Sequence, residues 1–246
     1  MAILYIVGTP IGHLKDVTIR ALEILKGVDL ILCEDTRVTQ KLLNHFDIKT
    51  KTLSYHQHSK LKKIRYILEL LRDGRNLALV SDAGTPGISD PGNRLVKEVT
   101  ESLSDQVKII PIPGPSAVTT AASISGFPMD KFLFLGFPPT KRKRKKFFEE
   151  MFHQLADSKY PVILYESPYR ILKTLNELKL LTTHYPLPTN VVVCRELTKK
   201  FETVYRGTIE EVIKQIENPP AGAKIKGEFV IIVGTVPKTR GVGSQC

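Results

Sequence analysis

The first part of the chain alternates short apolar runs with segments in which apolar residues recur every three to four positions. Asp16 is suited to cap a helix that ends at Gly27, and Ser59 to cap one that ends at Gly74. Strands that alternate with helices are typical of a parallel sheet covered by helices. We therefore predict an α/β fold with five strands here, at residues 3–7, 28–33, 50–54, 77–81 and 107–112.

The segment PIPGPSA, residues 111–117, is dense in proline and glycine and is expected to break regular structure. We place a domain boundary there, which gives an N-terminal α/β domain over 1–113 and a C-terminal α/β domain over 114–236. The last residues, 237–246, are expected to form a disordered tail.

The second half also shows strand and helix patterns, but several of its strands follow one another closely in sequence. This spacing predicts a mixed or antiparallel sheet. The expected strands and helices lie, respectively, at residues 132–136, 162–166, 190–195, 202–206 and 229–233, and near 146–156, 169–178 and 209–217.

Composition narrows the cellular setting. Cys33, Cys194 and Cys246 are far apart and lack the spacing of a metal or redox motif, which favours a reducing cytosol. No apolar run approaches the roughly 20 residues that cross a bilayer, so we expect a cytoplasmic protein without a membrane segment. The net charge of +11 favours a polyanionic partner such as nucleic acid, although many basic proteins are simply soluble.

The unusual loops follow the predicted parallel strands, where an open α/β sheet binds its ligands. They are GTPIG at 8–12, EDTR at 34–37 and SDAGTPGISDPG at 81–92. Glycines allow a ligand to approach the backbone closely, and an aspartate can accept from hydroxyl or amino groups. The first loop also fits an ordinary strand-to-helix turn, and Asp35 also fits a helix cap.

Other ligand classes are disfavoured. The chain lacks both GxxxxGK[ST] and a GxGxxG after the first strand, which argues against a phosphate-binding P-loop and the usual dinucleotide fold. The spacing of His56 and His58 resembles a metal pair, but no third ligand is identifiable, so we predict no metal.

Six motifs together carry a family resemblance: GTPIG, EDTR, SDAGTPGISDPG, PIPGPSA, YESPYR at 165–170 and CRELTK at 194–199. In this order along the chain they resemble the bacterial small-subunit (16S) ribosomal RNA (cytidine 2'-O)-methyltransferases of the tetrapyrrole methylase superfamily. The resemblance implies a two-domain fold, a homodimer, and S-adenosylmethionine bound in the cleft between domains. It also implies cofactor contacts near 227–229 and at Pro10, Asp82, Ala83, Gly84, Ser116, Ala117, Tyr165 and Leu197.

Methyl transfer to a ribose hydroxyl requires alignment with the sulfonium and benefits from a base or from cations that stabilise the developing alkoxide. The candidate proton acceptors are Asp35, His56 and Glu166. Glu166 and Arg170 could instead form only an ion pair on a helix surface. The candidate cations are Arg37, Arg170, Arg195 and Lys199.

A run of six cations follows GFPPT: Lys141, Arg142, Lys143, Arg144, Lys145 and Lys146. Their mutual repulsion predicts a mobile loop that contacts RNA phosphates, within 16S ribosomal RNA or the small subunit.

Two alternatives for the function of the protein stay open: a superfamily methylase for a small molecule such as a tetrapyrrole precursor, and a non-catalytic RNA-binding assembly factor.

Overall fold

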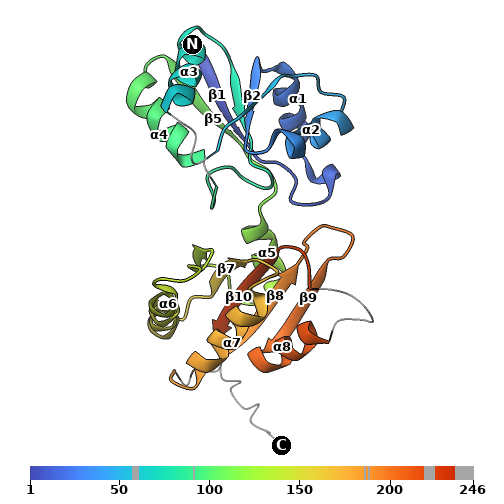
Figure 1. The fold of residues 1–246 in the computed structure, drawn as a ribbon, viewed down its shortest axis with the longest axis vertical. Coiled ribbons are helices and arrows are strands. Elements are labelled where there is room, and N and C mark those ends of the chain that lie inside the picture. The colour runs from blue at the N-terminus through green and yellow to red at the C-terminus, as the bar shows by residue number, and fades with distance from the viewer. Residues whose placement is uncertain (57–60, 91, 186, 188, 219–224, 236–246) are drawn as a thin grey trace, which may run out of the picture. The chain divides into compact units, whose positions relative to one another are not determined.

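The computed structural model describes residues 1–56, 61–90, 92–185, 187, 189–218 and 225–235 (Figure 1). The chain divides into two compact units, Met1–Ser116 and Ala117–Cys246. Ser59 and the predicted tail at 237–246 lie outside the described residues. Within the described part, no helix is long and apolar enough to cross a membrane.

The first unit contains one parallel sheet in the order β3-β2-β4-β1-β5, which confirms the predicted α/β fold. Helices α3 and α4 cover one face, with Ile67 and Val99 in that core, and α1 and α2 cover the other, with Leu25 and Leu43 (Figure 1). The elements are β1 Ala2–Val7, α1 Ile19–Gly27, β2 Leu30–Cys33, α2 Thr36–His45, β3 Thr52–Ser54, α3 Leu61–Arg72, β4 Leu77–Leu79, α4 Gly92–Leu103 and β5 Val107–Ile112.

One local prediction for this unit is corrected. Thr18, not Asp16, caps α1, because its hydroxyl accepts the amide of Ala21 at 3.1 Å, while Asp16 lies in the preceding 3-10 turn. The strand β5 runs from Val107 through Pro111 to Ile112, as predicted, and regular structure breaks after it, at residues 113–116. Pro111 is tolerated within the strand because β5 is an edge strand and the missing N–H removes no hydrogen bond within a central ladder.

The helices that follow the neighbouring strands β1 and β4 lie on opposite faces of the sheet. Helix α1 joins the core that contains Leu25, and α4 joins the core that contains Val99. The two connections therefore part at the carboxyl ends of these strands, which is the point where open α/β sheets bind ligands. The loops that leave this point are 8–12 and 81–92.

The second unit contains a mixed sheet in the order β6-β7-β10-β8-β9, as predicted: β6 and β7 are parallel and the other pairs antiparallel. Helices α6, α7 and α8 supply Phe152, Leu175 and Val212 to the core on one face of this sheet (Figure 1). The elements are α5 Ala117–Ser125, β6 Leu133–Gly136, α6 Arg144–Ser158, β7 Val162–Glu166, α7 Ile171–Thr182, β8 Thr189–Arg195, β9 Thr203–Thr208, α8 Ile209–Glu217 and β10 Phe229–Thr235.

Gly114 provides a test of the close approach between the loops that follow β1 and β5. A Cβ at this position would lie 2.9 Å from the carbonyl oxygen of Gly8, so Gly114→Ala must push two backbones apart. We expect a loss of about 1–3 kcal/mol in the free energy of unfolding, measured by urea denaturation followed by circular dichroism.

Gly27→Ala is the matched control, because nothing lies within 4 Å of its added Cβ at the end of α1. It should leave stability unchanged or raise it by up to about 1 kcal/mol. Equal midpoints for both variants would contradict the close approach.

Candidate functional site

The loops after β1, β4 and β5 are joined by backbone hydrogen bonds. Thr9 and Gly84 exchange two of them, from Thr9 N to Gly84 O at 2.9 Å and from Gly84 N to Thr9 O at 3.0 Å. The Thr85 hydroxyl donates to the carbonyl of Pro115 at 3.2 Å. These contacts, together with the glycine approach described above, hold three motif loops at one end of the first sheet. We call the described residues of the segments 8–12, 34–37, 81–92 and 113–116 the first edge.

The long loop of the first edge is ordered by its own polar groups. The Asp90 carboxylate accepts the amides of Gly87 and, at 3.3 Å, Gly92. The Asn93 side-chain amide donates to the carbonyl of Gly87 at 2.9 Å. A Cβ on Gly92 would lie 2.8 Å from the nitrogen of Gly87, so this turn requires glycine. Asp90 therefore shapes the loop, while Asp82 and Ala83 remain exposed.

Carboxylates cluster on the first edge. Partial burial, together with the nearby charges of Asp35 and Asp90, raises the pKa of Asp82 above its ordinary value, although the amide of Asp35 donates to it at 3.0 Å. Burial and the charges of Asp82 and Asp90 also raise the pKa of Glu34. The first edge is thus acidic and suits a ligand that carries positive charge or donates hydrogen bonds.

Asp35 caps α2, as one reading of the sequence expected. Its carboxylate accepts the Arg37 amide at 2.8 Å and pairs with the Arg37 guanidinium at 2.6 Å. These hydrogen bonds lower the pKa of Asp35 to about 2. A carboxylate with so low a pKa is a poor general base at neutral pH.

The predicted cofactor residues differ in exposure. Asp82 and Ala83 are exposed on the first edge, whereas Pro10 and Gly84 are buried there. Ser116 ends the first unit and Ala117 begins α5. In the second unit, Tyr165 is half-buried beside Phe134 and Phe137, and Leu197 is buried. These assignments stay predictions.

The motif loops of the second unit also meet at one sheet edge. Phe229 at the start of β10 pairs with Glu166 at the end of β7 and with Arg195 at the end of β8, and β6 ends beside β7. The segments 137–143, 167–170, 196–199 and 226–228 therefore lie at this edge, which we call the second edge. It brings together Arg170, Arg195 and Lys199, three of the four predicted cations.

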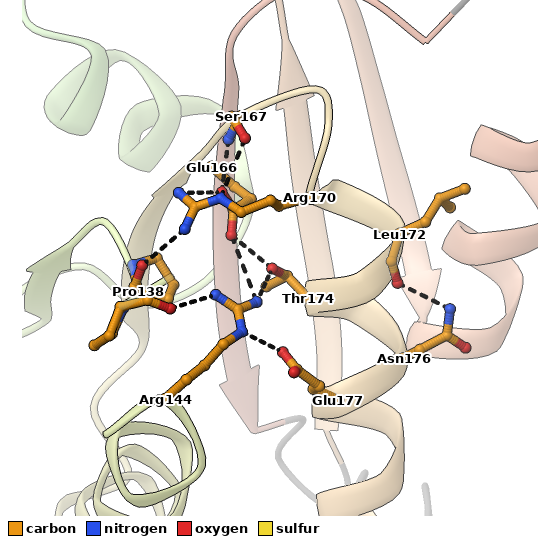
Figure 2. Close-up of polar contacts among 10 residues, drawn as sticks. Pro138, Arg144, Glu166, Ser167, Arg170, Leu172, Thr174, Asn176 and Glu177 are labelled. Atoms are coloured by element: carbon orange, nitrogen blue, oxygen red, sulfur yellow. Dashed lines mark hydrogen bonds and ion pairs between the residues drawn. The ribbon is translucent and has the colours of Figure 1, made fainter. Parts of the chain in front are cut away.

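A buried network of charged and polar side chains underlies the second edge (Figure 2). Glu166 is 1% exposed, and its two oxygens have separate partners. Oε1 accepts the Ser167 amide at 2.7 Å and pairs with Arg170 at 2.8 Å. Oε2 accepts the Thr174 hydroxyl at 2.6 Å and lies 3.8 Å from Arg144 Nη2. The carboxylate is fully occupied inside the unit, so it cannot reach a substrate hydroxyl, and Glu166 is removed from the candidate bases.

Arg144 completes the network and corrects the expectation for the basic run. Its guanidinium pairs with Glu177 at 2.7 Å and donates to the Thr174 hydroxyl at 2.6 Å and to the carbonyl of Pro139 at 2.9 Å (Figure 2). Arg144 is only 4% exposed and is not available to phosphates. It also begins α6, so the run is not a mobile loop throughout. Repulsion between the cations is relieved because one of them is neutralised by the buried carboxylate of Glu166 and the partly exposed carboxylate of Glu177.

The other candidates have different surroundings. Lys199 lies between Glu196 at 2.9 Å and Glu228 at 2.8 Å; although burial acts in the opposite direction, these hydrogen bonds raise its pKa. Arg195 donates to the carbonyl of Lys226 at 2.8 Å. His56 is exposed after β3, and His58 lies outside the described residues. Among the described residues, no group of three or more His, Cys, Asp or Glu side chains could hold a metal.

The sequence interpretation singled out neither Glu34 and Asp90 on the first edge nor Thr174 and Glu177 in the network next to the second edge. The spacing of Arg170, Thr174 and Glu177 at i, i+4 and i+7 places them on one helix face and was a usable signal. Their partner Arg144 follows β6 and lies far away in the sequence, so no local pattern indicated it.

Together, the doubly covered parallel sheet, its glycine-rich loops and the mixed second sheet define a two-unit α/β protein whose motif loops lie at the sheet edges. The chain belongs to the tetrapyrrole (corrin/porphyrin) methylases, whose family model matches residues 3–213.

Curated relatives cover nearly the whole chain. Ribosomal RNA small subunit methyltransferase I of Halalkalibacterium halodurans is 45% identical over 230 residues, which are 94% of this chain and 75% of the relative. The protein of the same name from Mycoplasmopsis pulmonis is 46% identical over 232 residues, 94% of this chain and 97% of the relative.

Solved structures of lower identity share the fold. The methyltransferase CobJ aligns with a TM-score of 0.67 at 17% identity, over 96% of this chain and 95% of CobJ. The cobalt precorrin-4 methyltransferase CbiF aligns with a TM-score of 0.64 at 19% identity, over 94% of each chain. This likeness confirms the predicted fold class.

Replacing Glu166 tests the buried network. Glu166→Ala leaves Arg144 and Arg170 facing each other without their shared carboxylate, and we expect a loss of about 3–5 kcal/mol in the free energy of unfolding. Urea denaturation followed by circular dichroism measures it.

Glu150→Ala removes an exposed carboxylate 3.5 Å from Lys146 and serves as the control, with an expected cost below about 1 kcal/mol. If Glu166→Ala were as stable as this control, the network would not support the second edge.

Proposed function

We propose that this protein is an S-adenosylmethionine-dependent methyltransferase that methylates the ribose 2'-hydroxyl of a cytidine in 16S ribosomal RNA. The observation that carries the proposal is the identity of about 45% to relatives named ribosomal RNA small subunit methyltransferase I, over 94% or more of the chain. The net charge of +11 and the cations of the second edge support an RNA substrate.

The first edge fits S-adenosylmethionine chemically. When bound, this cofactor supplies a methyl group activated by a sulfonium. Its ammonium and ribose hydroxyls donate hydrogen bonds, and the exposed Asp82 carboxylate can accept them. The glycines that join the loops at 8–12, 81–92 and 113–116 leave little side-chain bulk around the backbone, which allows close approach.

The residues of this chain contribute mainly by positioning the reactants. Glu166 is enclosed and the pKa of Asp35 is about 2, so neither is well suited to accept a proton. Lys199 is paired with two carboxylates, which offset its charge. His56 and the cations Arg37 and Arg195 remain the proposed groups for proton acceptance and alkoxide stabilisation. Alignment of the hydroxyl with the sulfonium and exclusion of water then supply much of the rate enhancement.

Five cations of the basic run are exposed and are proposed to bind RNA phosphates: Lys141, Arg142, Lys143, Lys145 and Lys146. The buried Arg144 anchors this segment through its contacts with Glu177 and Thr174. Such contacts give affinity but do not select the nucleotide, so selection must come from other residues.

Methyl transfer to small ribosomal subunits tests the function directly. Subunits from a strain that lacks the endogenous enzyme would be incubated with tritiated S-adenosylmethionine and digested to nucleosides. We expect label in 2'-O-methylcytidine. Cofactor binding without label in any RNA nucleoside would favour the scaffold alternative, and label in an added tetrapyrrole precursor would favour the small-molecule alternative.

Asp82→Asn tests the cofactor site. Loss of the charged acceptor should weaken S-adenosylmethionine binding at least about tenfold in calorimetry at pH 8, since hydrogen bonds to charged groups contribute about 1.5–3 kcal/mol. Because protonation removes the charge that strengthens these hydrogen bonds, wild-type affinity should also fall as the pH drops through the pKa of Asp82, which is raised above its ordinary value.

The asparagine variant should lack most of this pH dependence. Asp73→Asn, at the exposed end of α3, is the control and should bind as the wild type does. Unchanged affinity of Asp82→Asn at pH 8 would remove Asp82 from the cofactor site.

A further inference from the structure

Two aromatic side chains are exposed on the second edge. Tyr169 is 96% exposed, and Phe137 is 52% exposed. A single exposed aromatic residue is ordinary on a protein surface. These two differ because both belong to segments that the buried network holds together.

The network fixes the backbone next to each ring. Arg170 Nη1 donates to the carbonyl of Pro138 at 3.1 Å, and this hydrogen bond joins the residue after Tyr169 to the residue after Phe137 (Figure 2). Arg170 is anchored in turn by Glu166, and Arg144 holds the adjoining carbonyl of Pro139. The backbone next to both aromatic residues is therefore held in place by the buried charged network.

Phe137 is also supported from the side. Its ring centroid lies 5.4 Å from that of Tyr165, and Tyr165 lies 4.9 Å from Phe134. The remaining half of the Phe137 surface faces solvent. A ring held in this way loses little side-chain entropy when a flat partner packs on it.

Exposed cations follow at once in the chain. Lys141, Arg142 and Lys143 begin two residues after Pro139, and all three are exposed. Aromatic rings beside a cationic segment are the combination by which proteins bind single-stranded nucleic acid, with bases on the rings and phosphates on the cations. A base within a continuous double helix has no free face to offer, so the geometry suits an unpaired segment.

We propose that Tyr169 stacks on an unpaired nucleobase of the RNA substrate, and that Phe137 provides a second apolar contact for the same segment. This inference rests on the proposed function and adds the residues that distinguish unpaired from paired RNA. The cations at 141–143 then bind the phosphates of that segment, while Arg144 and Glu166 act as positioning residues.

Binding of a fluorescently labelled single-stranded RNA oligomer containing cytidine, measured by anisotropy over a range of salt concentrations, tests the proposal. Tyr169→Ala should weaken affinity about 5- to 150-fold, as stacking contributes about 1–3 kcal/mol per base. The dependence of affinity on salt should stay unchanged, because no charge is lost. Tyr169→Phe keeps the ring and should restore most of the affinity.

Arg142→Gln is the matched comparison. It should weaken binding and reduce the salt slope by about 0.7, the value for one phosphate contact on a single strand. The same oligomer annealed to its complement should bind wild type and Tyr169→Ala equally. Since Tyr169 is almost fully exposed, both of its variants should unfold at the wild-type urea midpoint.

The outcomes separate the two levels of inference. Wild-type affinity for single-stranded RNA in Tyr169→Ala, or equal losses with single-stranded and duplex RNA, would overturn the stacking proposal alone. If the wild-type protein neither bound the oligomer nor methylated ribosomal subunits, the proposed function would fail and the stacking proposal with it.

Discussion

The buried carboxylate of Glu166 imposes the strongest single constraint on the second unit. Removing an ionised carboxylate from water costs several kcal/mol unless charges and hydrogen bonds compensate it. Here two arginines, a threonine hydroxyl and a backbone amide do so. Because these partners come from α6, α7 and the loop after β7, satisfying one carboxylate fixes the arrangement of all three. The shape of the second edge therefore depends on this requirement.

In the first unit, backbone contacts instead of buried charges hold the motif loops in place. The loops of this unit are joined by backbone hydrogen bonds. Its glycines also allow two backbone segments to come into close contact, as at Gly8 and Gly114. Because main-chain groups make these contacts, they place little side-chain bulk on the first edge. Asp82 remains exposed there among other carboxylates. A scaffold of glycine suits a site that must admit a small ligand close to the backbone, whereas buried ion pairs suit a surface that must present side chains.

The two edges differ in charge in a way that matches the proposed reaction. Carboxylates gather on the first edge, where a cofactor with a sulfonium and an ammonium would gain from them. Exposed cations and aromatic rings gather on the second, where phosphates and bases would gain. The family model and the relatives identify the class of enzyme, while these charges indicate how the two reactants would be told apart.

Local sequence patterns were enough to predict the α/β class, the parallel first sheet, the mixed second sheet and the position of the ligand loops, because hydrophobic periodicity and glycine-proline loops are local signals. The sequence interpretation missed α4 and α5, which follow loop-like segments, and it treated six consecutive cations as equivalent. Only the tertiary structure showed that Arg144 is buried and its neighbours are exposed. The same fold enclosed Glu166 and exposed Tyr169. Burial depends on partners distant in sequence, such as Glu177 for Arg144, and no local pattern contains that information.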